Sequence, residues 1–107
     1  MPIANVLAPE RPQQQLGESR IRAMDFSHYP EIADNGETLT GTPTVTVTPS
    51  GVLTVGATSI VGSQVRFRVS GGALLSGTTE RVFRFEVLVN TSASNILEGD
   101  GILILTD

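Results

Sequence analysis

RVFRFEVLVN, at Arg81–Asn90, is the stretch that decides the fold. Every second residue from position 83 is a large apolar one, and these residues share one face of the stretch: Phe83, Phe85, Val87 and Val89. The other face carries Val82, Arg84, Glu86 and Leu88. Alternation of this length with a period of two is typical of a β-strand that buries one face. The stretch therefore predicts a long strand that forms one wall of an apolar core.

Shorter stretches of the same kind, rich in β-branched residues, lie on both sides and are separated by Gly, Pro and Ser turns. We expect these strands near residues 20–26, 44–48, 52–55, 58–61, 64–69 and 102–105. Segment 27–35 is expected to be a loop and 95–101 a turn. About seven short strands, spaced by roughly 8–12 residues, predict a single all-β sandwich domain over residues 20–107.

The same alternation assigns inner and outer faces. In the first strand we expect Ile21 and Ala23 at the core, with Phe26 close to it. Val45 and Val47 share one face of the strand at 44–48, and the inward residues of the strand at 64–69 are Val65, Phe67 and Val69. Arg66 and Arg68 then point outward. There they belong to a solvated charged face, make cross-strand ion pairs with a strand that carries Arg84 and Glu86, or bind a partner.

Residues 1–19 differ from the rest and predict an extended N-terminal arm. Prolines and three consecutive glutamines disfavour helix and central strand there. The arm also contains four apolar residues, Ile3, Val6, Leu7 and Leu16, which a purely solvated tail does not need. We expect these to dock on a neighbouring protein, with a disordered terminus as the alternative. Deletion of residues 1–18 is then expected to leave the domain folded but to abolish its assembly.

Composition excludes several classes of function. The chain has 107 residues, a net charge of −4, seven Arg, and no Lys or Cys, which excludes disulfides and Schiff-base lysines. A weakly acidic chain is a poor nucleic-acid ligand. No apolar stretch is long enough to span a membrane, and no signal peptide is visible, so we expect synthesis in the cytoplasm and neither nucleic acid nor membrane as partner.

Catalytic and cofactor motifs are not apparent. His28, the only histidine, follows Ser27 in a loop, and adjacency in sequence does not make a catalytic pair. The acidic segments 34–37 and 98–101 resemble fragments of calcium loops, but ordinary turns use the same residues. We therefore expect no enzyme, no cofactor and no metal site. The apolar residues Leu74 and Leu75 of a loop, with Leu88, are candidates for exposed contact residues.

Five segments in order resemble a family of small tailed-phage virion proteins, the fibre–tail adaptor proteins. They are Met24-Asp25-Phe26-Ser27, Gly36-Glu37-Thr38-Leu39, Ser50-Gly51-Val52-Leu53-Thr54, 65–72 (VRFRVSGG) and Ser76-Gly77-Thr78-Thr79. The resemblance covers about two-thirds of the chain. It departs from the family where Glu80-Arg81 stands in place of an aromatic residue. The resemblance implies an immunoglobulin-like antiparallel β-sandwich that joins larger parts of a virion.

These observations predict a virion adaptor, seated in the tail or tail–fibre region, that binds other virion proteins and copies of itself. The partner-binding candidates are Ile3, Val6, Leu7, Leu16, Leu74, Leu75, Arg66 and Arg68. A capsid cement or decoration protein is the first alternative. A carbohydrate-binding sandwich is the second, with Tyr29 and Phe26 as the aromatic candidates for a sugar platform.

Overall fold

The computed structural model describes residues 13–107, so the arm residues Ile3, Val6 and Leu7 lie outside the described residues. The strands are β1 (Gln13–Gln15), β2 (Arg20–Asp25), β3 (Leu39–Thr48), β4 (Leu53–Val55), β5 (Ser59–Val61), β6 (Gln64–Gly71), β7 (Glu80–Thr91) and β8 (Ile96–Thr106). A short helix, α1, spans Pro30–Ala33. Within 13–107, no helix has the length and apolar character needed to cross a membrane.

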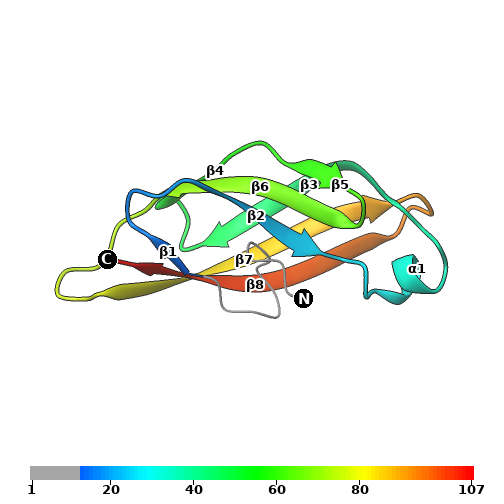
Figure 1. Cartoon of the computed structure of the whole chain (residues 1–107). Coiled ribbons are helices and arrows are strands. Elements are labelled where there is room, and N and C mark those ends of the chain that lie inside the picture. Colours follow the sequence, from blue (N-terminus) through cyan, green and yellow to red (C-terminus); the bar gives the residue numbers. More distant parts are fainter. Residues whose placement is uncertain (1–12) are drawn as a thin grey trace.

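The strands form two sheets packed face to face (Figure 1). One sheet has the order β1-β8-β7-β3, and the other has the order β2-β6-β4, with β5 also paired to β6. The described pairings are antiparallel, apart from the parallel pairing of β1 with β8. The all-β sandwich predicted from the alternating stretches is confirmed.

Apolar side chains from both sheets fill the space between them. Phe83, Phe85, Val87 and Val89 point inward from β7, and none is more than 2% exposed, as predicted. Phe85 stacks on Phe67 of β6 with ring centroids 5.8 Å apart. Removal of such a side chain from water contributes about 1.5–3 kcal/mol. The inner face of β7 is therefore a main source of folding free energy.

Gly99 allows the two sheets to approach closely at one point of the core. It lies opposite Val87 in the ladder of β7 and β8, and it is buried. A Cβ atom at this position would lie 2.8 Å from Met24 Cγ and 2.9 Å from Phe26 Cζ, which come from β2 and the residue after it. A larger residue would displace these side chains from their packed positions.

The inner face of β2 is the opposite of the one predicted from Ile21. Ile21 is 40% exposed, whereas Arg22 is 1% and Met24 2% exposed. Arg22 and Met24 pair with the inward residues Phe67 and Val65. The prediction for Ile21 was wrong because an arginine was assumed to face solvent, whereas here buried polar partners accept hydrogen bonds from it. Ala23 is also buried, but it lies on the outer face with Ile21, opposite Arg66, so its predicted place on the core face was wrong. Phe26 is buried as expected.

Three stretches differ in secondary structure from the expectation. Residues 13–15, assigned to the arm, form β1 and pair with 104–106 of β8. Residues 98–101, expected in a turn, belong to β8, since Glu86 pairs with Asp100 and Phe85 with Gly101. The loop at 27–35 contains α1. Pairing with distant strands overrides the local preference of Gln, Gly and Asp in the first two cases.

Candidate partner-binding surface

The outer face of β2, β6 and β5 brings arginines beside apolar side chains. Arg66 lies between Ala23 of β2 and Ser59 of β5, and Arg68 lies opposite Ile21. Directly paired residues in a sheet project to the same face. The structure thus brings together Arg66 and Arg68, two of the residues predicted to bind a partner, and adds Ile21 to them.

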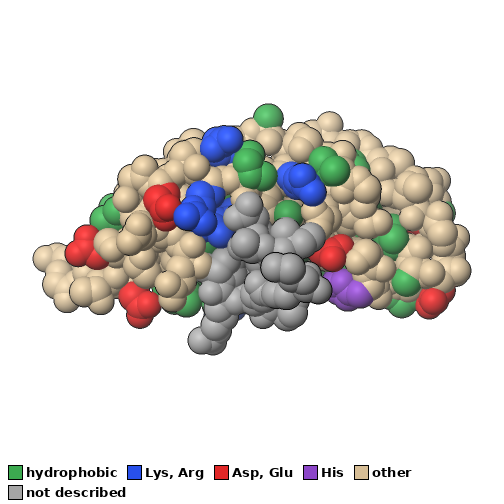
Figure 2. Space-filling model, in the orientation of Figure 1, with side chains coloured by type: hydrophobic (Ala, Val, Ile, Leu, Met, Phe, Trp, Pro, Cys, Tyr) green, Lys and Arg blue, Asp and Glu red, His purple; other side chains and the backbone are tan. Residues whose placement is uncertain are grey.

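A groove of ≈ 510 Å³ lies on this face. It is lined by Ile21, Gly56, Ala57, Ser59, Val61, Arg66, Phe67 and Arg68. Ile21 is 40% and Val61 46% exposed. Figure 2 shows arginine side chains interspersed with hydrophobic ones over β2 and β6. The backbone N–H of Gly56 donates to the carbonyl oxygen of Arg68 at 2.8 Å, which holds the connection between β4 and β5 beside the groove.

Neutral neighbours position both arginines of the groove. Arg66 donates from Nε and Nη2 to Gln64 Oε1 at 3.2 and 3.0 Å. Arg68 donates from Nη1 to the carbonyl and hydroxyl oxygens of Ser19, both at 3.2 Å. No acidic side chain of residues 13–107 forms an ion pair with either of them. Within the described part of the chain no carboxylate neutralises their positive charge, which suits them to bind an anionic group.

The cross-strand ion pairs considered between these arginines and the strand that carries Arg84 and Glu86 do not form within residues 13–107. Arg84 and Glu86 lie on β7, which belongs to the other sheet. The outer faces of the two sheets point away from each other, so the residues of β6 and β7 on these faces cannot meet. The prediction of a cross-strand contact between them was wrong. The sequence could not show this, because alternation places a residue on a face but does not say which sheet contains the strand.

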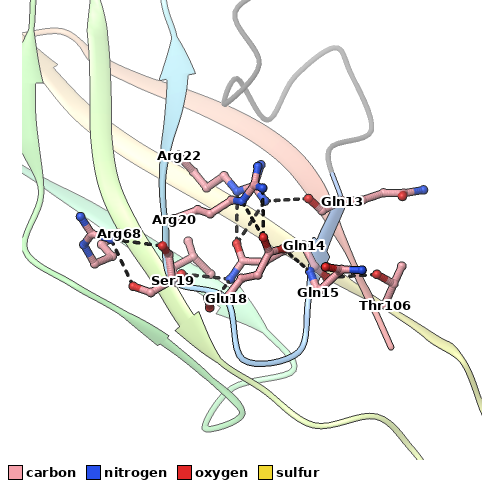
Figure 3. A network of polar contacts seen from close by, with 10 residues as sticks. Gln13, Gln14, Gln15, Glu18, Ser19, Arg20, Arg22, Arg68 and Thr106 are labelled. Atoms are coloured by element: carbon pink, nitrogen blue, oxygen red, sulfur yellow. Dashed lines mark hydrogen bonds and ion pairs between the residues drawn. The ribbon is translucent and has the colours of Figure 1, made fainter.

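Arg22 and Gln14 form a buried polar link between the two sheets (Figure 3). Arg22 donates from Nη2 to the Gln13 carbonyl at 2.8 Å and to Gln14 Oε1 at 3.1 Å, and from Nε to Gln14 Oε1 at 3.3 Å. Gln14 donates from Nε2 to the carbonyls of Val69 at 3.0 Å and Glu18 at 3.1 Å. Because Gln14 is in one sheet and Arg22 and Val69 are in the other, this link fixes β1 against β2 and β6.

The turn between β1 and β2 is held by Glu18. The backbone N–H of Gln15 donates to Glu18 Oε1 at 2.7 Å, and Arg20 forms a salt bridge with Glu18 at 3.0 Å. These bonds, the backbone one first, lower the pKa of Glu18. Burial, followed by the charge of Arg20, lowers the pKa of Arg22. A signal in the sequence could have found the buried Arg22. Arg22 is two residues from the apolar Met24, so in a strand the two side chains lie on the same face.

The predicted contact leucines occupy different environments. Leu75 is 57% and Leu16 38% exposed, whereas Leu74 is half-buried and packs against the core. Leu88 is also half-buried. The β1–β2 turn and the β6–β7 loop, which contain these exposed leucines, lie at the end of the sandwich near the C-terminus (Figure 1).

An acidic cluster lies on the outer face of β7 and β8. Carboxylate oxygens of Glu86, Glu98 and Asp100 lie within 4.8 Å of one another, and all three residues are exposed. A hydrogen bond to Asp100, and then the charges of Asp100 and Glu86, raise the pKa of Glu98. Carboxylates at this spacing could hold a divalent cation. Without one they repel one another at neutral pH.

The aromatic residues considered for a sugar platform are packed into the structure. Phe26 is 0% exposed. Tyr29 is half-buried, lies 5.2 Å from the Phe26 ring between centroids, and donates from its hydroxyl group to the Glu98 carbonyl. Burial raises the pKa of Tyr29. His28 contacts the Tyr29 ring, and in residues 13–107 no hydrogen bond joins it to Ser27.

Glu37, in the segment Gly36-Glu37-Thr38-Leu39, ties the start of β3 to the turn between β7 and β8. Its carboxylate accepts hydrogen bonds from Thr91 Oγ1 and from Asn95 Nδ2, the latter at 3.0 Å. These bonds, that from Thr91 first, lower the pKa of Glu37. Glu37, which belongs to one of the segments that resemble the adaptor family, thus joins two segments that are distant in sequence.

The fold defines a small two-sheet β-sandwich domain that places its candidate contact groups on an open outer face. A family model described as Podophage GP4 fiber-tail adaptor protein gp77 matches residues 14–103. The chain therefore belongs to this family, which confirms the resemblance drawn from its strand and turn segments. Membership supports a structural role as a tail adaptor in a phage virion, and suggests a protein that is not an enzyme. No curated protein sequence matches the chain significantly.

Proposed function

We propose that this protein joins a fibre to the tail of a podophage virion by binding a larger virion protein in the groove over β2, β6 and β5. The observation that carries the proposal is the combination, in one groove, of exposed Ile21 and Val61 with Arg66 and Arg68, neither of which has an acidic partner among residues 13–107. The family description favours the tail over a decoration role on the capsid.

The partner that suits this groove is an acidic, extended segment of protein with at least one apolar side chain. Arginine guanidinium groups bind carboxylates in a planar, bidentate manner. Apolar contact with Ile21 and Val61 supplies affinity, while the charges supply orientation and a faster association rate. A net charge of −4 makes nucleic acid a less suitable ligand.

A second contact lies at the end of the sandwich near the C-terminus. Leu16 and Leu75 are exposed there, in the β1–β2 turn and the β6–β7 loop, and offer apolar contact to a partner at that end. The arm residues Ile3, Val6 and Leu7 would extend this contact over a neighbouring subunit. The groove would then bind one virion component and the arm another, as an adaptor requires.

The test is incorporation of Arg66→Glu/Arg68→Glu into purified particles, measured by quantitative mass spectrometry. We expect a loss of at least about tenfold, because like charge against an acidic partner costs several kcal/mol. Arg84→Glu is the matched control, since it is an exposed arginine on the other sheet. Circular dichroism verifies that each variant is folded.

Wild-type occupancy of the double variant would show that the groove is not the docking site. Gold labelling of the wild-type protein in intact particles independently tests its location in the virion. Label on the tail supports the adaptor, whereas label distributed over the capsid shell would replace it with a decoration function.

A further inference from the structure

Strand β3 is the long, uncharged edge of its sheet. The other described edge strands are protected by shortness or by charge. β1, β4 and β5 have three residues each, and β2 carries Arg20 and Asp25. β3 has ten residues and none is charged. Soluble proteins usually protect long edges, because an open edge pairs with a strand of another molecule.

The flat part of this edge is Thr44–Thr48. A bulge between Thr40 and Thr44 ends it on one side, and Pro49 ends it on the other. The segment pairs with β7 on one side, and within 13–107 no strand is ladder-paired to it on the other, where Thr58 donates to the Pro43 carbonyl just before the segment. Alternate residues of a ladder direct both N–H and C=O away from the paired strand. The segment therefore presents backbone donors and acceptors to a further strand.

The residues of this segment suit a second copy of themselves. Thr44-Val45-Thr46-Val47-Thr48 is a palindrome. Antiparallel pairing of two copies about a twofold axis at Thr46 places threonine opposite threonine and valine opposite valine in every pair. Pairs of β-branched residues are favourable across strands, and a twofold interface needs a self-complementary surface of this kind.

We propose that two copies of this protein pair through Thr44–Thr48 of β3, antiparallel, to join their four-stranded sheets into one continuous sheet. The charges nearest the axis do not oppose this. Glu86 pairs with Thr46, so the two Glu86 residues of the dimer are three strand spacings, or about 14 Å, apart. This exceeds the screening length of about 8 Å at physiological salt. The pairing is independent of what the groove binds.

Thr46→Lys tests the proposal by sedimentation equilibrium on the full chain. Thr46 is exposed, so the monomer accommodates lysine, but in the dimer two ammonium groups meet at the axis. We expect a concentration-dependent wild-type dimer and a dissociation constant raised about tenfold or more in the variant. Thr40→Lys is the matched control, because Thr40 is also exposed on β3. In the proposed dimer Thr40 lies outside the paired segment, since the residue opposite it would come after Pro49 in the second copy.

An equimolar mixture of Thr46→Lys and Thr46→Glu should restore a heterodimer, which misfolded variants could not do. A wild-type chain that stays monomeric at about 1 mM, or a Thr46→Lys variant that dimerises like the wild type, would overturn the proposal. A monomeric wild type whose Thr46→Lys variant fails to enter particles would instead assign the edge to another virion protein. Arg66→Glu/Arg68→Glu should dimerise like the wild type. Failure of the dimer proposal can therefore be distinguished from failure of the groove proposal.

Discussion

Replacement of Gln14 by leucine removes the acceptor that holds a buried arginine. Gln14 and Arg22 are each 1% exposed, and the variant deprives Nε and Nη2 of Arg22 of the Oε1 acceptor at 3.3 and 3.1 Å. Nη2 keeps the Gln13 carbonyl at 2.8 Å. The carbonyl of Val69 also loses a donor. Loss of a hydrogen-bond partner of a buried charged group costs about 1.5–3 kcal/mol.

Because one acceptor remains, we expect a loss of about 2 kcal/mol. That corresponds to a fall in Tm of about 8–16 °C for a domain of this size. The measurement is urea unfolding followed by circular dichroism, with a two-state fit. Gln13→Leu is the matched control, since the Gln13 side chain is exposed and only its backbone carbonyl is used.

A double-mutant cycle separates the charge from the packing. Arg22→Met alone removes the buried charge and should cost less than Gln14→Leu, because a buried ionic group can often be replaced by an apolar one at little cost. Arg22→Met/Gln14→Leu should be more stable than Gln14→Leu alone. Additive effects, or a Gln14→Leu cost within about 0.5 kcal/mol of the wild type, would refute the role assigned to this link.

Two further predictions concern the acidic cluster and the N-terminal boundary. The pKa of Glu98 is raised in the folded state, so its contribution to stability is present below the unfolded pKa and is lost as the pH rises through the folded pKa. Glu98→Gln should therefore raise Tm at pH 7 but not at pH 3, and an equal gain at both would exclude repulsion from Asp100 as the cause. Deletion of residues 1–12 leaves β1 intact and should preserve Tm, whereas deletion of 1–18 removes β1 and Gln14 and should lower it strongly. Equal Tm values for the two truncations would show that β1 does not stabilise the sandwich. If the variant that lacks residues 1–12 entered particles at wild-type occupancy, the proposal of a docking arm would be wrong.

The two proposed contacts use different properties of the sandwich. The groove offers side chains, so charge and apolar contact decide what binds there. The β3 edge offers backbone groups, so strand geometry decides. An adaptor that pairs with its own copy through an edge keeps both outer faces free for other components of the virion.

The all-β class and most strands could be predicted from local sequence. The alternation at Arg81–Asn90 assigned Phe83 and Phe85 correctly to the core, because a strand with one buried face must alternate in this way. The segment Thr44–Thr48 was also placed correctly in a strand. Both are regular stretches in which local preference and tertiary burial agree.

Only the tertiary structure decided the positions of Gln14, Arg22 and Gly99. Arg22 can face inward because Gln14, from the other sheet, accepts its hydrogen bonds. Gln14 in turn donates to Val69, 55 residues away in sequence. Gly99 lies inside a strand because Met24 and Phe26 fill the space that a side chain would need. The sequence by itself determined which segments become strands and where most of their apolar faces lie. Whether a polar or a small residue is buried depended on partners from distant segments, because burial of such a residue is stable only when those partners satisfy its hydrogen bonds or fill its space.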